Sequence, residues 1–335
     1  MNPLHTFERA LRRHTHTWSS LSWAEKLLLL GGSFLFKRIL HKRWTLLNEH
    51  LLASSLSPEP QEALILSEIV LKEVGITALK AIRHPRGRRL LGSTQRQRTR
   101  WDDLKGSLDS SQIRLCGEQR LRSIFQSPRG LIILSAHLGD FEELIHLSEL
   151  LDRPVSVVSK RMKSPLAQWL WDQSRQNGPK RLDRQGSGRH LISSLRAGHV
   201  VAEVLDQHDP RPRALPISFL GRVAMTSPDV ARAALLSDAI IAPIFLYRGE
   251  IGSETATRPR YTLVVDHLID PRAYRDKGLR QATQISLLTR RCVAATERAV
   301  RRAPEQWLWL HRRWKAHPDS DHSNDAQLDM QTKLS

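Results

Sequence analysis

Short apolar runs alternate with segments of helical periodicity from about residue 130 to residue 302. Short apolar runs predict buried strands, and apolar residues recurring every three to four positions predict amphipathic helices. The predicted strands are residues 131–135, 155–159, 199–205, 240–247 and 261–265, and the predicted helices are residues 139–151, 165–176, 189–196, 228–236 and 278–302. This alternation favours an α/β fold with a mixed, mostly parallel central sheet flanked by helices.

The chain before about residue 110 is predicted to be helical. Residues 61–82 have an amphipathic pattern, and residues 18–56 combine tryptophan and leucine with lysine and arginine. The second composition suits a helix lying in a membrane interface and equally a helix packed on the protein's own core. Because no linker is evident, we expect a helical, membrane-associating portion over residues 1–110, an α/β core over 111–315 and a polar disordered tail over 316–335.

The most apolar stretch is residues 27–36, where ten uncharged residues lie between Lys26 and Lys37. A helix needs about 20 such residues to cross a bilayer. We therefore expect peripheral or monotopic attachment to a membrane, without a spanning helix.

Basic residues dominate the charge of the chain. Lysine and arginine total 52 against 34 aspartates and glutamates, so the formal net charge is +18. A charge of this size favours a polyanionic partner, which can be a nucleic acid, an anionic bilayer or an acidic protein. The dense basic stretch over residues 80–105 suits a phosphate-binding patch and also an ordinary solvated surface, so the charge alone leaves the partner open.

Several site classes are excluded by what the sequence lacks. Its two cysteines, Cys116 and Cys292, are far apart, which excludes a disulfide framework and a cysteine-rich zinc site and fits a reducing cytosol. The sequence also lacks a His-Glu-x-x-His zinc motif, a Gly-x-x-x-x-Gly-Lys phosphate loop and a Gly-x-Ser-x-Gly nucleophile turn. We therefore expect no metal and no cofactor.

The strongest candidate for chemistry follows the apolar run at residues 131–135. His137 stands where that strand should end, Gly139 permits a tight turn, and Glu142 falls in the first turn of the next helix. This spacing lets the carboxylate fold back to one imidazole nitrogen, which would fix the tautomer and make the histidine a general base toward a substrate. A histidine and a glutamate that merely cap a helix would give the same pattern.

Three further stretches, together with His137 and Glu142, resemble the bacterial lipid A biosynthesis acyltransferases, a family within the lysophospholipid acyltransferase superfamily. They occur in the family's order between about residues 130 and 315. The resembling stretches are an arginine, helix, Leu-x-x-Gly, strand and Asp-Gln sequence over 184–207, a Phe-Leu-Gly turn with a following threonine over 217–226, and Pro-Glu-Gln-Trp-Leu-Trp-Leu-His-Arg-Arg-Trp-Lys over 304–315. In the last stretch, the spacing of the tryptophans predicts a half-buried strand with His311 and Arg313 on its opposite face.

The resemblance implies an acyltransferase with a His137–Glu142 base pair. It would move a fatty acyl chain from acyl carrier protein or coenzyme A to a hydroxyl of a lipid A precursor or another anionic lipid, on the cytoplasmic face of the inner membrane. Arg184 and Arg189 would anchor a phosphate or polarise the carbonyl, and Asp206 would orient one of these arginines. An ordinary surface ion pair explains these three residues equally well.

The chain departs from the family pattern at two places. Asp140 and Phe141 stand where the family often has Asn-Trp, and the usual single N-terminal membrane-spanning helix is not evident. Two other function classes therefore remain to be compared with the acyltransferase. One is a non-enzymatic protein that binds anionic membranes or nucleic acids, although the resemblance implies no nucleic-acid partner, and the other is a hydrolase that uses the same His-Glu pair on water.

Overall fold

A computed structural model describes most of the chain. The described residues are 3–19, 21–56, 59–83, 101–110, 112–148, 151, 153–159, 180–183, 188–251, 259–275 and 278–315. Four sequence predictions lie outside them: the helix over 165–176, the site residue Arg184, the tail over 316–335 and most of the basic stretch over 80–105.

A seven-stranded sheet forms the centre of the molecule, in the order β1-β9-β8-β2-β5-β3-β4. The strands are β1 (Ile113–Cys116), β2 (Leu131–Ser135), β3 (Val155–Ser159), β4 (Lys180–Asp183), β5 (Val200–Val204), β8 (Ile240–Arg248) and β9 (Tyr261–Val265). Every neighbouring pair is parallel except β8 and β9. The predicted α/β class, with a mixed and mostly parallel sheet flanked by helices, is confirmed.

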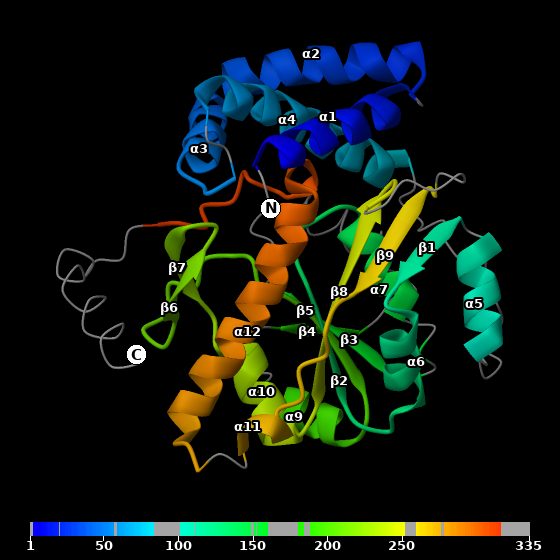
Figure 1. Cartoon of the computed structure of the whole chain (residues 1–335), viewed down its shortest axis with the longest axis vertical. Coiled ribbons are helices and arrows are strands. Elements are labelled where there is room, and N and C mark those ends of the chain that lie inside the picture. Colours follow the sequence, from blue (N-terminus) through cyan, green and yellow to red (C-terminus); the bar gives the residue numbers. More distant parts are fainter. Residues whose placement is uncertain are drawn as a thin grey trace.

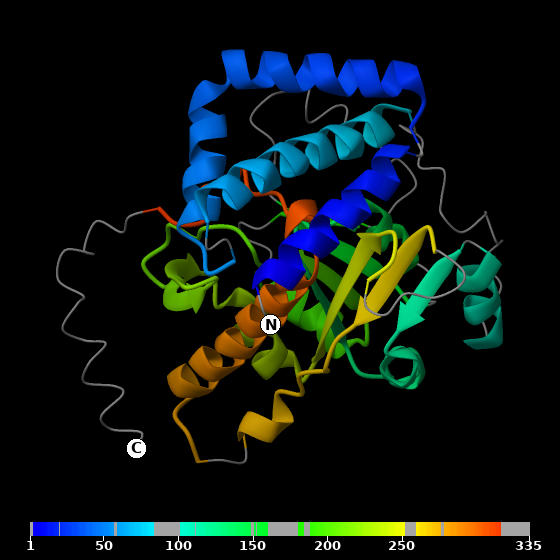
Figure 2. The ribbon, with the colours of Figure 1, turned by 45° about the horizontal axis from the view of Figure 1, so that its top comes forward.

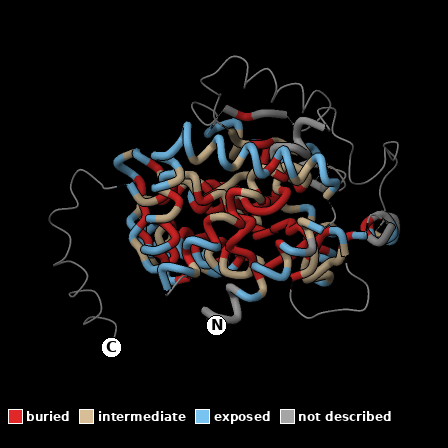
Figure 3. The backbone as a smooth tube through the Cα atoms, turned by 90° about the horizontal axis from the view of Figure 1, so that it is seen from above, coloured by how far each residue is buried: buried red, intermediate tan, exposed pale blue. Residues whose placement is uncertain are grey.

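Both faces of the sheet are covered, as Figure 1 shows. Helices α5 (Trp101–Ser110), α6 (Glu118–Gln126) and α7 (Phe141–Ser148) lie on one face, and α9 (Gly188–Arg196), α10 (Asp229–Ser237) and α12 (Gln281–Arg302) lie on the other. Strand β2 has all five residues buried, with Leu131 and Ile133 in one hydrophobic core and Ile132 and Leu134 in the other. Continuous apolar runs are typical of parallel strands that are covered on both faces. Buried residues accordingly fill the middle of the molecule (Figure 3).

The first four helices of the described chain lie together at one end of the sheet, as both Figure 1 and Figure 2 show. They are α1 (Pro3–Ser19), α2 (Trp23–Ile39), α3 (His41–Leu52) and α4 (Pro60–Arg83). Helices α1 and α4 pack against the short 3-10 helix η2 (Pro304–Gln306) near the end of the described chain. Within the described ranges, every helix is too short or too polar to span a bilayer.

The structure differs from the sequence prediction mainly in four strands and one C-terminal segment. Strands β1 and β4 and the antiparallel hairpin of β6 (Leu215–Phe219) and β7 (Arg222–Thr226) were not predicted. The prediction of a half-buried strand at Trp307 and Trp309 is wrong. After η2 the chain follows turns and bends, and both indole rings are fully buried. Helix α11 (Arg272–Arg275) leads into α12.

Candidate active site

His137 lies just beyond the carboxyl end of β2, and Asp206 lies beside it just beyond β5. The two strands are parallel neighbours, with Ser135 opposite Val204 in their register. Two residues further along each strand direction are His137 and Asp206, so the sheet brings them together although they are 69 positions apart. The carboxyl ends of strands in open α/β sheets are where active groups gather.

The turn that carries His137 is fixed by backbone hydrogen bonds. The His137 carbonyl accepts from the amide of Leu308 at 3.0 Å, and the Gly139 amide donates to the carbonyl of Gln306 at 3.0 Å. Gly139 has φ +60, and a Cβ there would lie 2.2 Å from the carbonyl oxygen of Leu246. Only glycine fits this position, so the tight turn expected from the sequence is required by both conformation and space.

One carboxylate holds both the backbone and the ring of His137. Asp206 Oδ2 accepts from the His137 amide at 2.8 Å, and Asp206 Oδ1 lies 2.9 Å from His137 Nδ1. The indole N–H of Trp307 also donates to Asp206 Oδ2, at 2.8 Å. Burial alone would raise the pKa of Asp206, but the charge and hydrogen bond of His137, with the indole N–H, hold that pKa well below its usual range. Asp206 is therefore a buried carboxylate, 1% exposed.

The ionised Asp206 sets the protonation of the imidazole. Burial acts to lower the pKa of His137, but the charge of Asp206 and its hydrogen bond raise it, and the charge of Glu142 adds to the rise. A carboxylate at Nδ1 keeps the proton on that nitrogen in the neutral ring, which leaves the lone pair on Nε2. The His137 side chain is 15% exposed, so the pair has the arrangement of a general base with one nitrogen directed at a substrate.

Three side chains surround the outer part of the His137 ring. Gln207 Nε2 lies 3.4 Å from His137 Nε2 and 3.4 Å from His311 Nε2. The His137 ring also meets those of His311 and Phe141 edge-on, with centroids 4.8 and 4.9 Å away. Burial, with the charge of His137, lowers the pKa of His311 to about 4, so this second imidazole is neutral at physiological pH.

Arg313 fixes the segment that carries Gln207. Its Nη1 donates to the Gln207 carbonyl at 2.7 Å and to the Met225 carbonyl at 3.1 Å, and its Nη2 donates to Thr226 Oγ1 at 2.7 Å. The guanidinium also stacks over the Phe219 ring. Burial lowers the pKa of Arg313 to about 10, which still leaves it charged at neutral pH.

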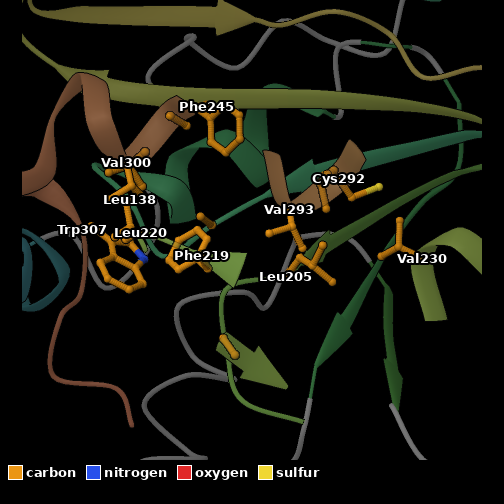
Figure 4. Close-up of a cluster of buried hydrophobic side chains, with 14 of the residues drawn as sticks. Leu138, Leu205, Phe219, Leu220, Val230, Phe245, Cys292, Val293, Val300 and Trp307 are labelled. Atoms are coloured by element: carbon orange, nitrogen blue, oxygen red, sulfur yellow. The ribbon is translucent and has the colours of Figure 1, made fainter. Parts of the chain in front are cut away.

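An apolar cluster supports the site from within the core. Leu138 pairs with Trp307 in an isolated antiparallel bridge, and the Trp307 ring meets Phe219 edge-on at 5.5 Å. Figure 4 shows these three side chains beside Leu220 and Val300. The C-terminal segment is thus part of the site's frame, because its rings fill the space behind Asp206.

A buried charge cluster joins the N-terminal helices to the turn after His137. Arg248, at the end of β8, binds Asp140 through Nη1 and Glu73 of α4 through Nε and Nη2, and Glu73 Oε1 lies 2.9 Å from His14 Nδ1 in α1. All four side chains are buried. Burial raises the pKa of Glu73, but Arg248 and His14 more than offset it and lower that pKa overall. Asp140, the first of the two residues that depart from the pattern of the resembling family, thus forms an ion pair with Arg248.

The predicted site residues are placed as follows. His137 and Asp206 come together, although Asp206 binds the imidazole instead of the expected arginine, because the strand register sets it there. Glu142 is half-buried in the first turn of α7 and acts on His137 through its charge; its role as the ring's hydrogen-bonding partner stays a prediction. Arg189 is exposed in α9, and Arg184 lies outside the described residues.

Sequence reasoning missed Gln207, His311 and Arg313 as parts of one site. Gln207 follows Asp206 directly, and His311 and Arg313 stand in the tryptophan-rich block, so the residues that carry the resemblance already marked both places. Within the described ranges, no three His, Cys, Asp or Glu side chains are placed to hold a metal ion.

Comparisons with known proteins show which family this chain resembles. The model of the family described as bacterial lipid A biosynthesis acyltransferase matches residues 101–316, more than half of the chain. A lipid A biosynthesis acyltransferase of Haemophilus influenzae is 25% identical over 171 residues, 50% of this chain and 48% of that protein. A lipid A biosynthesis lauroyltransferase of Escherichia coli is 27% identical over 208 residues, 61% of this chain and 62% of that protein.

The matched part of this chain thus spans about half to three-fifths of those relatives' lengths. A solved structure, the 1-acyl-sn-glycerophosphate acyltransferase PlsC of Thermotoga maritima, aligns with 69% of this chain and 95% of its own, at 12% identity and a TM-score of 0.30. The match to the family model, over residues 101–316, includes every residue of the site described above except those in the N-terminal helices. The chain belongs to the bacterial lipid A biosynthesis acyltransferase family.

Proposed function

We propose that this protein transfers a fatty acyl chain from an acyl thioester to a hydroxyl group of a lipid A precursor or a related lipid. The observation that carries the proposal is the His137–Asp206 pair, a buried carboxylate that holds one imidazole nitrogen and leaves the other for a substrate. Membership of an acyltransferase family supports acyl transfer as the reaction that this base serves.

The reaction needs no group beyond the two substrates and the protein. His137 Nε2 takes the proton of the acceptor hydroxyl while its oxygen attacks the thioester carbonyl carbon. The tetrahedral intermediate then collapses, the carbon–sulfur bond breaks, and the leaving thiolate takes the proton from the imidazolium. Asp206 stabilises the imidazolium between these two steps, and the charge of Glu142 supports it.

The charge of the protein supports the choice of substrates. A net charge of +18 suits an anionic lipid acceptor and either an acidic acyl carrier protein or coenzyme A as the donor. Arg184 and Arg189 remain our candidates for contact with an acceptor phosphate, since a guanidinium matches phosphate oxygens in geometry.

The outer face of α2 supports attachment to the cytoplasmic face of the inner membrane. Figures 1 and 2 show α2 on the side of the N-terminal helices that is remote from the sheet. Leu29 of α2 is buried, but seven other large apolar side chains of this helix are exposed: Trp23, Leu27, Leu28, Leu30, Phe34, Leu35 and Ile39. Apolar residues flanked by Lys26, Lys37 and Arg38 suit a helix that lies in an anionic membrane interface.

Placing charges on this face is expected to weaken membrane binding. The double variant Leu27→Glu, Phe34→Glu should reduce co-sedimentation with vesicles of anionic phospholipid at least about tenfold, because burying either side chain contributes roughly 1.5–3 kcal/mol. Leu287→Glu, at an exposed leucine of α12, is the control and should bind as the wild type does. Equal binding of all three proteins would exclude α2 as the membrane contact.

The function itself is tested by lipid mass spectrometry of cells that carry the wild type, His137→Ala or no protein. We expect one acylated lipid that requires the wild type and is absent from the other two, since the variant lacks the base. The mass difference identifies the acyl chain, and fragmentation identifies the acceptor. If a folded and expressed wild type leaves all lipids unchanged, acyl transfer to a cellular lipid is not its function.

A further inference from the structure

The side-chain amide of Gln207 lies between two imidazole rings at the open side of the site. It is within 3.4 Å of Nε2 of both His137 and His311. No step of the proposed reaction yet uses it, nor does any step use His311. Both residues are half-buried, as is His137 itself.

The orientation of this amide follows from the protonation of the two rings. Because the Asp206 carboxylate accepts the Nδ1 proton of His137, His137 Nε2 carries a lone pair and needs a donor. The donor is the amide nitrogen of Gln207, since its oxygen would place two acceptors in contact. The neutral His311 can accept the second N–H of the same nitrogen at its own Nε2. The amide is thus held with both hydrogens toward the imidazoles.

The acceptor hydroxyl must occupy the same place as this amide hydrogen. A general base takes a proton across about 2.6–3.2 Å, so the incoming oxygen replaces Gln207 as the partner of His137 Nε2. The thioester carbonyl that it attacks then lies next to the released N–H. A donor already fixed at the position where negative charge develops stabilises that charge without costly reorganisation.

We infer that Gln207 is a further catalytic residue, whose side-chain N–H donates to the carbonyl oxygen of the thioester as that oxygen becomes negative, and that His311 is the positioning residue that holds the amide by accepting its other N–H. The inference rests on the proposed acyl transfer. When the intermediate collapses, the carbonyl re-forms and the N–H of Gln207 returns to His137 Nε2, so the amide gains and loses no proton.

The backbone around Gln207 supports this assignment. Arg313 binds the Gln207 carbonyl at 2.7 Å, and the preceding residue, Asp206, is fixed by the His137 amide and by Trp307. The donor is therefore mounted on a rigid segment, which is what a preorganised donor requires. Arg313 and His311 come from the same C-terminal stretch, so that stretch fixes Gln207 at both its backbone and its side chain.

The first test replaces Gln207 with methionine, which has a similar shape and no N–H donor. We expect kcat to fall about 10²–10³-fold with little change in KM, the loss that follows removal of one oxyanion donor. Gln284→Met in α12 makes the same chemical change remote from the site, where Gln284 donates to the Leu279 carbonyl, and should leave kcat unchanged. His311→Phe should lower kcat less, and His311→Gln should restore part of the loss, because its amide oxygen can accept from Gln207.

A second measurement does not depend on turnover. In protein with ¹⁵N-labelled histidine, at a pH above the raised pKa of His137, the His137 Nε2 resonance should have the shift of an unprotonated, hydrogen-bonded nitrogen and should move in Gln207→Met. A kcat of Gln207→Met within about twofold of the wild type, in a protein with an unchanged melting temperature, overturns the inference and leaves the proposed function standing. If instead the wild type transfers no acyl group, the proposed function fails, and an unchanged Nε2 resonance in Gln207→Met would overturn the Gln207 contact as well.

Discussion

Replacing Asp206 with asparagine is expected to lower kcat by about 10²–10⁴-fold, because the neutral amide neither fixes the proton on Nδ1 of His137 nor stabilises the imidazolium. The pH profile should change as well. His137 acts as a base only when it is unprotonated, and the charge of Asp206 raises its pKa. Without that charge the pKa falls, so the acid limb of the kcat profile should move to lower pH. Steady-state kinetics between pH 5 and 9 measure both effects.

The variant Glu142→Gln distinguishes the contribution of Glu142 to the activity of His137 from that of Asp206. Glu142 contributes to the raised pKa of His137 through its charge, after the larger contribution of Asp206, so its variant should move the acid limb in the same direction by a smaller amount. We expect Glu142→Gln to keep more activity than Asp206→Asn. The opposite order, with Asp206→Asn nearly as active as the wild type, would make Glu142 the carboxylate that orients His137 during turnover.

Arg248→Met is expected to cost about 3–5 kcal/mol of stability, because it leaves the carboxylates of Glu73 and Asp140 buried without their cation. Arg248 is 4% exposed, so water does not compensate for the lost charge. For a chain of this size the melting temperature should fall by roughly 4–7 °C. Thermal unfolding followed by circular dichroism at neutral pH measures the change.

Two further variants show whether the loss of stability in Arg248→Met comes from the unpaired buried carboxylates. Arg272→Met removes an exposed ion pair with Asp238 and should change stability by less than about 1 kcal/mol. Adding Glu73→Gln to Arg248→Met should restore part of the stability, because one unpaired charge is removed.

The lowered pKa of Glu73 makes the stability of the wild type depend on pH. The contribution of Glu73 to the free energy of unfolding is present above the ordinary pKa of 4.5 and is lost as the pH falls through the folded-state pKa. Equal losses in Arg248→Met and Arg272→Met would show that the buried carboxylates find other partners.

The strands that are buried on both faces could be predicted from the sequence, because burial in the core requires apolar residues at successive positions. Strand β2 has four consecutive apolar residues before Ser135 because helices cover both of its faces, and β8 and β9 are buried in the same way. Strands β1 and β4 lie at the two edges of the sheet, and their sequences, Ile-Arg-Leu-Cys and Lys-Arg-Leu-Asp, mix charged with apolar residues. Such short edge strands take their structure from the neighbour they pair with, which the local pattern does not contain.

The candidate site was predictable in part. His137 follows an apolar run that predicts a buried strand, and it lies beyond the carboxyl end of β2 as that prediction requires. The sequence spacing predicts Glu142 as the partner of His137, because the two residues are near each other in the chain. Asp206 is distant in the chain and lies beside the ring because β2 and β5 pair with Ser135 opposite Val204. Register depends on which strands are neighbours, and a single sequence does not state that order.

The tryptophan-rich block shows a different limit. Trp307 and Trp309 are spaced as in a strand, yet the indole N–H groups bind the Asp206 carboxylate and the Pro304 carbonyl inside the core. The segment is therefore shaped by its hydrogen-bond partners in three dimensions. Periodicity identified the apolar residues correctly and assigned the wrong backbone to them.

The long sequence separations between α1, α3 and the C-terminal segment have a consequence for synthesis. Arg13 binds Glu305, 292 residues later, and His50 lies 3.2 Å from the Trp309 carbonyl, 259 residues later. A ribosome makes the N-terminal helices before the core, so the inner faces of these helices have no C-terminal segment to pack against until nearly the whole core has been synthesised. During that interval both the inner faces and the apolar side of α2 are uncovered in the nascent chain. Helices α1 and α3 are thus made before the C-terminal residues that they bind, and α2, which we place on the bilayer, lies between them in the chain. A membrane surface is therefore available to this part of the chain before its partners in the core are.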